Sequence, residues 1–223
     1  MANRIEVAMQ PGRPDPAGGA VRHNLKEDLH IEAGDVRVVQ VYTIHAELSS
    51  AELEKARTEL FTDPIIEVSA IDQSLATDFD FVVEVGFRPG VTDNVGKSAL
   101  EGIQDTIGRH LPEGSAVFKS KQYVFKGVSK DDCLRATKRV LANDLIERWV
   151  MKSPAEMAAL NNAPLLDLPL VTDLSDPEVH EIDLEVGDDA LIALSRDMML
   201  ALELREMQAI QAWFAEAGRD PTD

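Results

Sequence analysis

Hydrophobic residues alternate with polar ones in several short runs, and these runs predict β-strands. Near the start of the chain, Ile5, Val7 and Met9 occupy every second position, which is the side-chain period of a strand. Two longer runs are rich in β-branched and aromatic residues, which favour strands. The predicted strands are therefore the segment around Ile5, the two long runs 36–44 and 116–125, and the shorter runs 65–68, 81–85 and 145–150.

Helical spacing separates these strands. Val21, Leu25 and Leu29 recur at intervals of four, and a matching apolar stripe joins Leu100 to Ile107, as on one face of a helix. Ser49 followed by Glu52 is a capping-box signature for a second helix, and Ser129 followed by Asp132 is a weaker version. The apolar faces of these two further helices carry Leu53, Ala56 and Leu60 in one case and Cys133, Ala136 and Val140 in the other.

The pattern occurs twice. Pro11-Gly12, Asp15 and Gly18 reappear 78 positions later, and further matches follow at offsets of 80 or 81: Gly34 with Gly114, Tyr42 with Tyr123, Ser49 with Ser129, Ala56 with Ala136, and Ile66-Glu67 with Ile146-Glu147. A collinear series of this period indicates two copies of a small domain. The sequence thus predicts an α+β fold with tandem β-α-β-α-β units, 1–73 and 78–152. Since ~70 residues make a marginal core, we expect the units to form a pseudo-dimer.

The last third of the chain has a different character. Four prolines follow closely, at 154, 164, 169 and 177, so we expect 153–186 to be an extended acidic linker. Residues 187–223 then predict a short helical segment, with one helix over 188–196 and a last helix that ends before Gly218. The last helix has a wide apolar stripe, from which we take candidate partner-docking residues: Met207, Ile210, Trp213 and Phe214.

Charge narrows the function classes. The formal net charge is −18; residues 1–150 contribute 18 basic and 24 acidic residues, and residues 151–223 contribute 4 and 16. This balance argues against nucleic acid and anionic membrane as main partners. The acidic tail is either a solvated face or a surface for a basic partner. One cysteine excludes an intramolecular disulfide. The first ten residues carry charges and no apolar core, so we do not expect a secretory signal there, and no apolar run approaches ~20 residues. We therefore expect the cytoplasm.

The sequence contains no convincing catalytic, cofactor-binding or metal-binding group. Gly90 to Ser98 resembles a phosphate-binding loop, but five residues rather than four precede Gly-Lys-Ser, and Asp93 would oppose a phosphate. The five histidines lack partners at metal-ligand spacing. Cys133 lies on an apolar helix face, which favours a buried thiol over a nucleophile.

Each predicted unit resembles PurS, the small subunit of phosphoribosylformylglycinamidine (FGAM) synthase. The resemblance rests on the loop Pro16–Val21, the long strand 35–44, the segment Asp63–Glu67, and in the second unit the run Leu141–Glu147. The tail, from Leu202 to Phe214 and then Gly-Arg-Asp-Pro-Thr-Asp at 218–223, is similar to the linker domain of the large FGAM synthase, PurL.

The resemblance implies a non-catalytic, structural part of FGAM synthase, the ligase of purine biosynthesis that converts FGAR, glutamine and ATP to FGAM. The implied partners are the synthetase and glutaminase domains or subunits, which this part would bridge while it supports ammonia transfer. ATP and magnesium would bind in the synthetase, outside this chain. A homodimer, and a choice between a fragment of a fused enzyme and a natural small subunit, stay open.

Two other classes remain as alternatives. Duplicated small α/β units also occur in amino-acid-sensing, ACT-like regulatory modules, in which the Pro-Gly loops 11–19 and 89–96 would hold the ligand. A phosphate-binding-loop NTPase is the third class, and it predicts ATP hydrolysis that depends on Lys97.

Overall fold

The computed structural model describes residues 2–171 and 180–222. The chain divides into two compact units, one reaching Val171 and the other beginning at Thr172.

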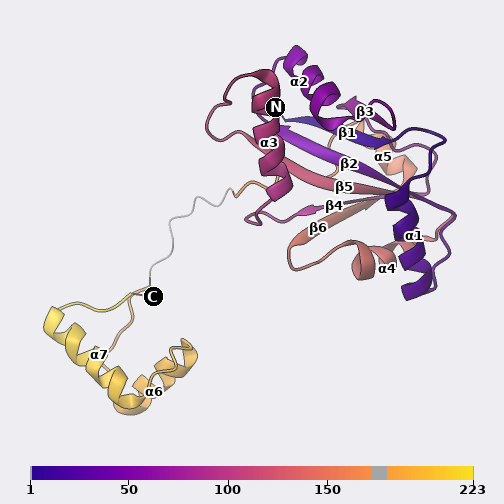
Figure 1. Ribbon diagram of the computed structural model, residues 1–223. Helices are drawn as coiled ribbons and strands as arrows, with labels where there is room; N and C mark the ends of the chain where they lie inside the picture. The colour runs from indigo at the N-terminus through magenta and orange to yellow at the C-terminus, as the bar shows by residue number, and fades with distance from the viewer. Residues whose placement is uncertain (1, 172–179, 223) are drawn as a thin grey trace. The chain divides into compact units, whose positions relative to one another are not determined.

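The first unit is built on one six-stranded antiparallel sheet with the strand order β3-β1-β2-β5-β4-β6. Its two long central strands pair along their whole length, from Asp35 opposite Lys126 to His45 opposite Ala116. The sequence halves that share the β-α-β-α-β order therefore contribute three neighbouring strands each to a continuous sheet (Figure 1). The strands are β1 (Asn3–Met9), β2 (Asp35–His45), β3 (Glu67–Ile71), β4 (Phe81–Phe87), β5 (Ala116–Lys126) and β6 (Glu147–Lys152).

Four helices of this unit lie where the apolar spacing predicts them: α1 (Pro16–Leu29), α2 (Ser50–Ala56), α3 (Asn94–Ile107) and α4 (Lys130–Ala136). A fifth, the short α5 (Pro154–Leu160), lies in a segment for which no helix was predicted. Both α2 and α4 continue into a π-helical turn, Arg57–Phe61 and Thr137–Leu141 respectively. The capping box at Ser49 is complete, whereas Ser129 lacks the reciprocal bond from its backbone amide to the third helical residue, because Asp132 is one methylene shorter than Glu52.

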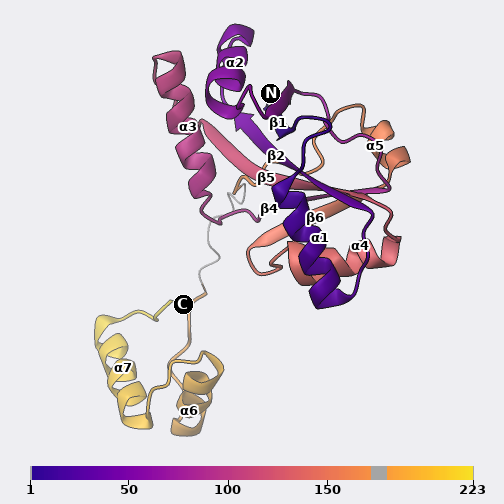
Figure 2. The ribbon, with the colours of Figure 1, turned by 45° about the vertical axis from the view of Figure 1, so that its right-hand side comes forward.

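The helices pack across the boundary between the halves. On one face of the sheet, α1 and α4 form a shared core in which Leu25 and Ile31 pack with Cys133 and Ala136. At the other end of the same face, α2 and α3 share a second core that includes Ala56 and Ile103. Figure 2 shows the two pairs, α1 beside α4 and α2 beside α3. Each core thus takes one helix from each half, and neither half buries its apolar face alone.

The opposite face of the sheet is covered by connecting segments. Leu75, Ala76 and Phe79, from the link between β3 and β4, and Leu165 pack on buried strand residues, which are Ala8, Val39, Val41, Val82 and Val124. Buried polar side chains lie on this face as well, among them Glu6, Glu84 and Gln122.

Two expectations from the sequence need correction. The strands β3 and β6 begin two residues later than expected, at Glu67 and Glu147, because a tight turn precedes each. The segment 153–186 is not extended throughout: Ser153 and Glu156 form a capping box and Pro154 takes the first helical position, so α5 begins there. Residues 172–179 of this segment, with Pro177, lie outside the described residues.

The second unit is a small helical hairpin. Its helices are α6 (Asp188–Asp197) and α7 (Leu204–Ala217), and Gly218 ends α7 in the left-handed conformation with φ 63°. Leu184, Leu191 and Met207 form its buried centre. A bridge between Glu181 and Thr222 joins the segment before α6 to the segment after α7.

Candidate functional site

Two aspartates fasten the Pro-Gly loops to the sheet. The carboxylate of Asp15 accepts the backbone N–H of Gly18 at 2.9 Å and that of Val38 in β2 at 2.7 Å. Asp93 repeats this arrangement with Gly96 at 2.7 Å and Lys119 in β5 at 2.6 Å. Each carboxylate caps a helix and ties its first turn to a central strand. The loops therefore act as joints of the fold.

The glycines after these aspartates allow the helix to touch the strand. A Cβ atom on Gly18 would lie 1.9 Å from the carbonyl oxygen of Val36, and one on Gly96 would lie 2.0 Å from that of Val117. Only glycine fits these two positions. The Asp93 carboxylate also accepts the Gly96 N–H in the first turn of α3. Asp93 and Gly96 therefore have structural roles in the loop from Gly90 to Ser98.

A polar cluster lies buried in the face of the sheet that the connecting segments cover. Gln122 donates through Nε2 to Glu6 at 3.1 Å and to Glu84 at 2.9 Å, so one amide bridges two carboxylates from different halves. Ser120 Oγ donates to Glu84 at 2.6 Å, and Arg4 forms an ion pair with Glu6 at 3.1 Å. All five side chains are buried. The arrangement links β1, β5 and β4 beneath the covering segments.

Burial changes the pKa of one member of this cluster, Glu6. Desolvation raises the pKa of Glu6 above its usual value; the neighbouring charge of Arg4 and the N–H of Leu75, which donates to Glu6 at 2.7 Å, act in the opposite direction. Two carboxylates and one arginine leave an excess negative charge if both acids ionise. Sequence reasoning missed the cluster, although Glu6 and Glu84 interrupt apolar runs at positions 78 apart.

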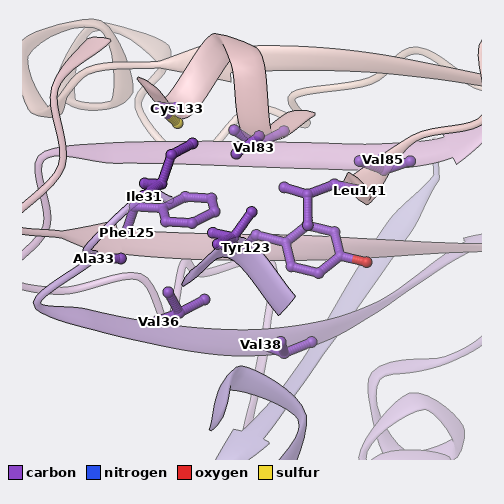
Figure 3. Close-up of a cluster of buried hydrophobic side chains, with 12 residues drawn as sticks. Ile31, Ala33, Val36, Val38, Val83, Val85, Tyr123, Phe125, Cys133 and Leu141 are labelled. Atoms are coloured by element: carbon purple, nitrogen blue, oxygen red, sulfur yellow. The ribbon is translucent and has the colours of Figure 1, made fainter. Parts of the chain in front are cut away.

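Cys133 has the character expected from the sequence. It is fully buried between α4 and the sheet, where Figure 3 shows its sulfur at the edge of the apolar cluster. Desolvation raises the pKa of its thiol to about 12, so the reactive thiolate is scarce at neutral pH. Within residues 2–171 and 180–222, His, Cys, Asp and Glu form no group of three that could hold a metal ion.

The four docking candidates of the tail separate by exposure. Met207 is buried in the centre of the second unit, and Ile210 and Phe214 pack against that centre. Trp213 is 55% exposed and stands edge-on to Phe214, with ring centroids 4.8 Å apart. The Arg219 guanidinium lies over both rings. Trp213 is therefore the candidate whose side chain a partner can reach, while the others hold the hairpin together.

Each half of the first unit also presents an exposed aliphatic tip at the turn before its last strand. Ile65 is 71% exposed and Leu145 is 86% exposed. The turns are built alike: Asp63 and Asn143 accept the N–H groups of Ile65 and Leu145 through their side chains, at 2.8 and 3.1 Å. These hydrogen bonds shape the turns from which the two apolar side chains project into solvent. The repeat alignment places Ile65 and Leu145 at equivalent positions, but only the structure shows that both are exposed.

In the part that the structure describes, no helix is long and apolar enough to cross a membrane.

Comparison with known proteins matches part of the chain to a known family. A search of curated proteins found no match. Residues 2–74 match the family model PurS, described as phosphoribosylformylglycinamidine (FGAM) synthase. These residues, which comprise β1 to β3 with α1 and α2, therefore form a PurS-like domain, and the match points to a role for the chain in FGAM synthase and purine biosynthesis.

Proposed function

We propose that this chain is a non-catalytic structural and assembly part of FGAM synthase. It would bridge the synthetase and glutaminase parts of the ligase and support ammonia transfer between them. The observation that carries the proposal is the match of residues 2–74 to the PurS family model. ATP, magnesium and the reacting groups then belong to the partner domains or subunits.

The arrangement of the first unit supports an internal pair of PurS-like domains. Residues 81–152 have the same order of elements as residues 3–71, and their strands occupy the mirrored places in the sheet. The helix pairs α1–α4 and α2–α3 each join the two halves. We infer from this pairing that the second half is also PurS-like, and that the covalent link replaces the association of two separate chains.

The state of the ionisable side chains also favours a structural role. By residue type, Cys133 could be a nucleophile and Glu6 and Glu84 could be general bases, yet all three are buried. The two glutamates are engaged by Gln122, and Cys133 is surrounded by apolar residues. A nucleophile or general base must reach its substrate.

Reconstitution tests the proposal. Omitting this chain from a mixture with the synthetase and glutaminase parts should abolish FGAM formation from glutamine, while formation from added ammonia should persist. If the chain belongs to a longer polypeptide, which an immunoblot of source cells would show as a band far above 24.5 kDa, deleting its segment makes the same comparison. Unchanged glutamine-dependent synthesis without the chain would refute the proposal.

The tail offers a sharper version of this test. Trp213→Ala should weaken capture of the synthetase part by at least tenfold, because an exposed aromatic side chain on a helix is a typical binding hot spot. Met199→Ala is the matched control, since Met199 is 89% exposed in the same unit. The proposal for Trp213 fails if both variants bind the synthetase as the unmodified chain does.

A small-ligand regulatory module is the alternative. It predicts that glycine, glutamine or purine nucleotides raise the melting temperature of the isolated chain. The loops at Asp15 and Asp93 are occupied by their own capping bonds, which favours the assembly role over ligand loops of that kind. No thermal shift with any of these compounds would remove the alternative.

A further inference from the structure

A hollow of about 250 Å³ lies in the helix-bearing face of the sheet, within the second half. Its walls come from β4, the start of α3, β5 and β6, including Phe87, Val95, Lys119, Lys121 and Glu147. The hollow is large enough for a small molecule or for one charged group of a larger ligand.

Three residues that line the hollow, Lys119, Lys121 and Leu141, have different side chains at the corresponding positions of the first half. Counting along the two eleven-residue central strands, Val38 in β2 corresponds to Lys119 in β5, and Gln40 corresponds to Lys121. Phe61, which packs on Tyr42 with ring centroids 4.3 Å apart, corresponds to the smaller Leu141. Figure 3 shows Leu141 beside Tyr123 and Val85, three residues that line the hollow, with the Tyr123 hydroxyl pointing away from Phe125. The second half therefore has more space and two added cations.

These cations lack counterions. Among the described residues, neither Lys119 nor Lys121 has a carboxylate within 4.0 Å of its ammonium group. Lys119 Nζ donates to the carbonyl oxygen of Ser120 at 2.6 Å and lies 4.6 Å from the centre of the Tyr42 ring. The ammonium of Lys119 is largely buried, whereas Lys121 is exposed. A buried ammonium without an anion is unfavourable, and the charge of Lys121 nearby makes the charged form of Lys119 less favourable still.

Asp93 and Glu147 also line the hollow. Their carboxylates neither pair with the two ammoniums nor face an anion unscreened, because both accept backbone N–H groups. Both oxygens of Asp93 accept backbone N–H groups, from Gly96 and from Lys119 itself. Glu147 accepts the N–H of Asn143 at 2.7 Å through one oxygen. The first turn of α3 is already capped by Asp93, so the positive groups available to a ligand are the two lysine ammoniums.

We propose that this hollow binds a small oxyanion, a carboxylate or a tetrahedral group such as phosphate or sulfate, between Lys119 and Lys121. An anion there pairs both ammoniums and relieves their mutual repulsion. A divalent cation is disfavoured by the same two charges, and the net charge of −18 opposes a polyanion such as nucleic acid. The inference does not depend on the role in FGAM synthase, because it concerns the chain alone.

Sulfate is the first probe, since it keeps its charge from pH 5.5 to 9. Calorimetric titration of the full chain with sodium sulfate should show saturable binding that sodium chloride at equal ionic strength does not reproduce. Sodium acetate is the second probe: saturable binding of acetate in preference to sulfate assigns the site to carboxylates, and the reverse assigns it to tetrahedral anions. Absence of saturable binding for both overturns the proposal.

The variants come from the chain itself. Lys119→Val and Lys121→Gln install the residues that β2 carries, which fit the same fold, and the double variant should lose at least tenfold in affinity. Lys97→Met is the control, because it removes an exposed lysine from the first turn of α3 that does not line the hollow. Equal weakening by Lys97→Met, or unchanged binding by the double variant, would contradict the assignment.

The pH dependence gives an independent readout. Desolvation, with a contribution from the charge of Lys121, lowers the pKa of Lys119 to about 7, while Asp93 and Glu84 act in the opposite direction. Sulfate affinity should therefore fall as the pH rises from 6 to 9 and Lys119 loses its proton. Lys119→Val should remove this dependence. A wild-type affinity that is constant over this range would count against Lys119 as a ligand.

Discussion

The two halves of the first unit have the same order of elements and the same helix-start contacts, but their central strands β2 and β5 carry different side chains. Asp15 and Asp93 make the same pair of bonds, from a helix start to a central strand. Gly18 and Gly96 allow the same close contact between helix and strand. The two aspartates satisfy backbone N–H groups and the two glycines avoid a clash with a backbone carbonyl, so other residues fit poorly at these positions.

The central strands show what the frame leaves free. Where β2 carries Val38, Val39 and Val41, the corresponding positions of β5 carry Lys119, Ser120 and Gln122. On one face this exchange produces the lysine-lined hollow, and on the other it produces the amide that joins Glu6 to Glu84. Within a symmetrical framework, β5 therefore carries polar side chains at positions where β2 carries apolar ones.

The largest effect is expected from Gln122→Glu. This change places a third carboxylate between Glu6 and Glu84, and an unpaired buried charge is destabilising by ~3–5 kcal/mol. Chemical denaturation followed by circular dichroism should show loss of most of the stability at pH 7, with partial recovery as the pH falls toward 4 and the cluster takes up protons.

Gln40→Glu is the matched control for that change. Gln40 lies next to Val39 on the other face of the sheet, and its strand partner is Lys121, so a new carboxylate there meets a cation. The stability should change by less than ~1 kcal/mol. Equal losses of stability in the two variants would mean that the Gln122 bridge between Glu6 and Glu84 contributes no more to stability than an ordinary strand position.

Alanine at the contact glycines should have the next largest effect. Gly18→Ala and Gly96→Ala each force a methyl group against a backbone carbonyl, and such overpacking is destabilising by ~1–3 kcal/mol. Gly19→Ala, in the same helix as Gly18, meets no atom within 4 Å and should stabilise the fold by ~0.5–1 kcal/mol. Urea denaturation measures all three. A large difference between Gly18→Ala and Gly96→Ala would break the equivalence of the halves.

Lys119→Val should alter the pH dependence of stability in a chloride buffer. The pKa of Lys119 is lowered to about 7 from 10.5, so between these values the unfolded chain binds more protons and the wild-type protein gains stability as the pH rises. The variant lacks this gain and should be more stable at pH 6 by ~1 kcal/mol, given the partial exposure of the side chain. Parallel stability profiles for the two proteins would exclude this role of Lys119.

The smallest effect concerns the second helix of each half. Asp132→Glu gives Ser129 the reciprocal partner that Ser49 has in Glu52, and it should stabilise the chain by ~0.5 kcal/mol. The reverse change, Glu52→Asp, should destabilise, because it also shortens the reach to Arg109. Thermal melts of both variants test the comparison, and a loss of stability in Asp132→Glu would contradict it.

The order of elements in the first unit could be predicted from the sequence because strand and helix periods are local properties. The alternation around Ile5 and the spacing of Val21, Leu25 and Leu29 predicted β1 and α1. The turn before β3 was placed less well, because the Asp63 and Glu67 carboxylates that shape it bind backbone groups that a pattern does not display. The short α5 was missed because the prolines around it dominated the composition.

The candidate sites were harder to predict. Trp213 and Met207 belong to one apolar stripe, and only packing separated the exposed ring from the buried thioether. The Glu6–Gln122–Glu84 cluster joins residues up to 116 positions apart, which no local pattern connects. Lys119 reads in the sequence as an ordinary strand lysine.

Local patterns were enough to predict the doubled order of strands and helices, the buried character of Cys133 and the resemblance to PurS, of which the family match covers residues 2–74. Those features depend on residues near one another in the chain. Three features could be known only from the folded chain: the halves share one sheet, each core takes a helix from both halves, and polar groups of β5 face a hollow and a buried cluster. Register and burial decided these features, because both depend on contacts between distant segments.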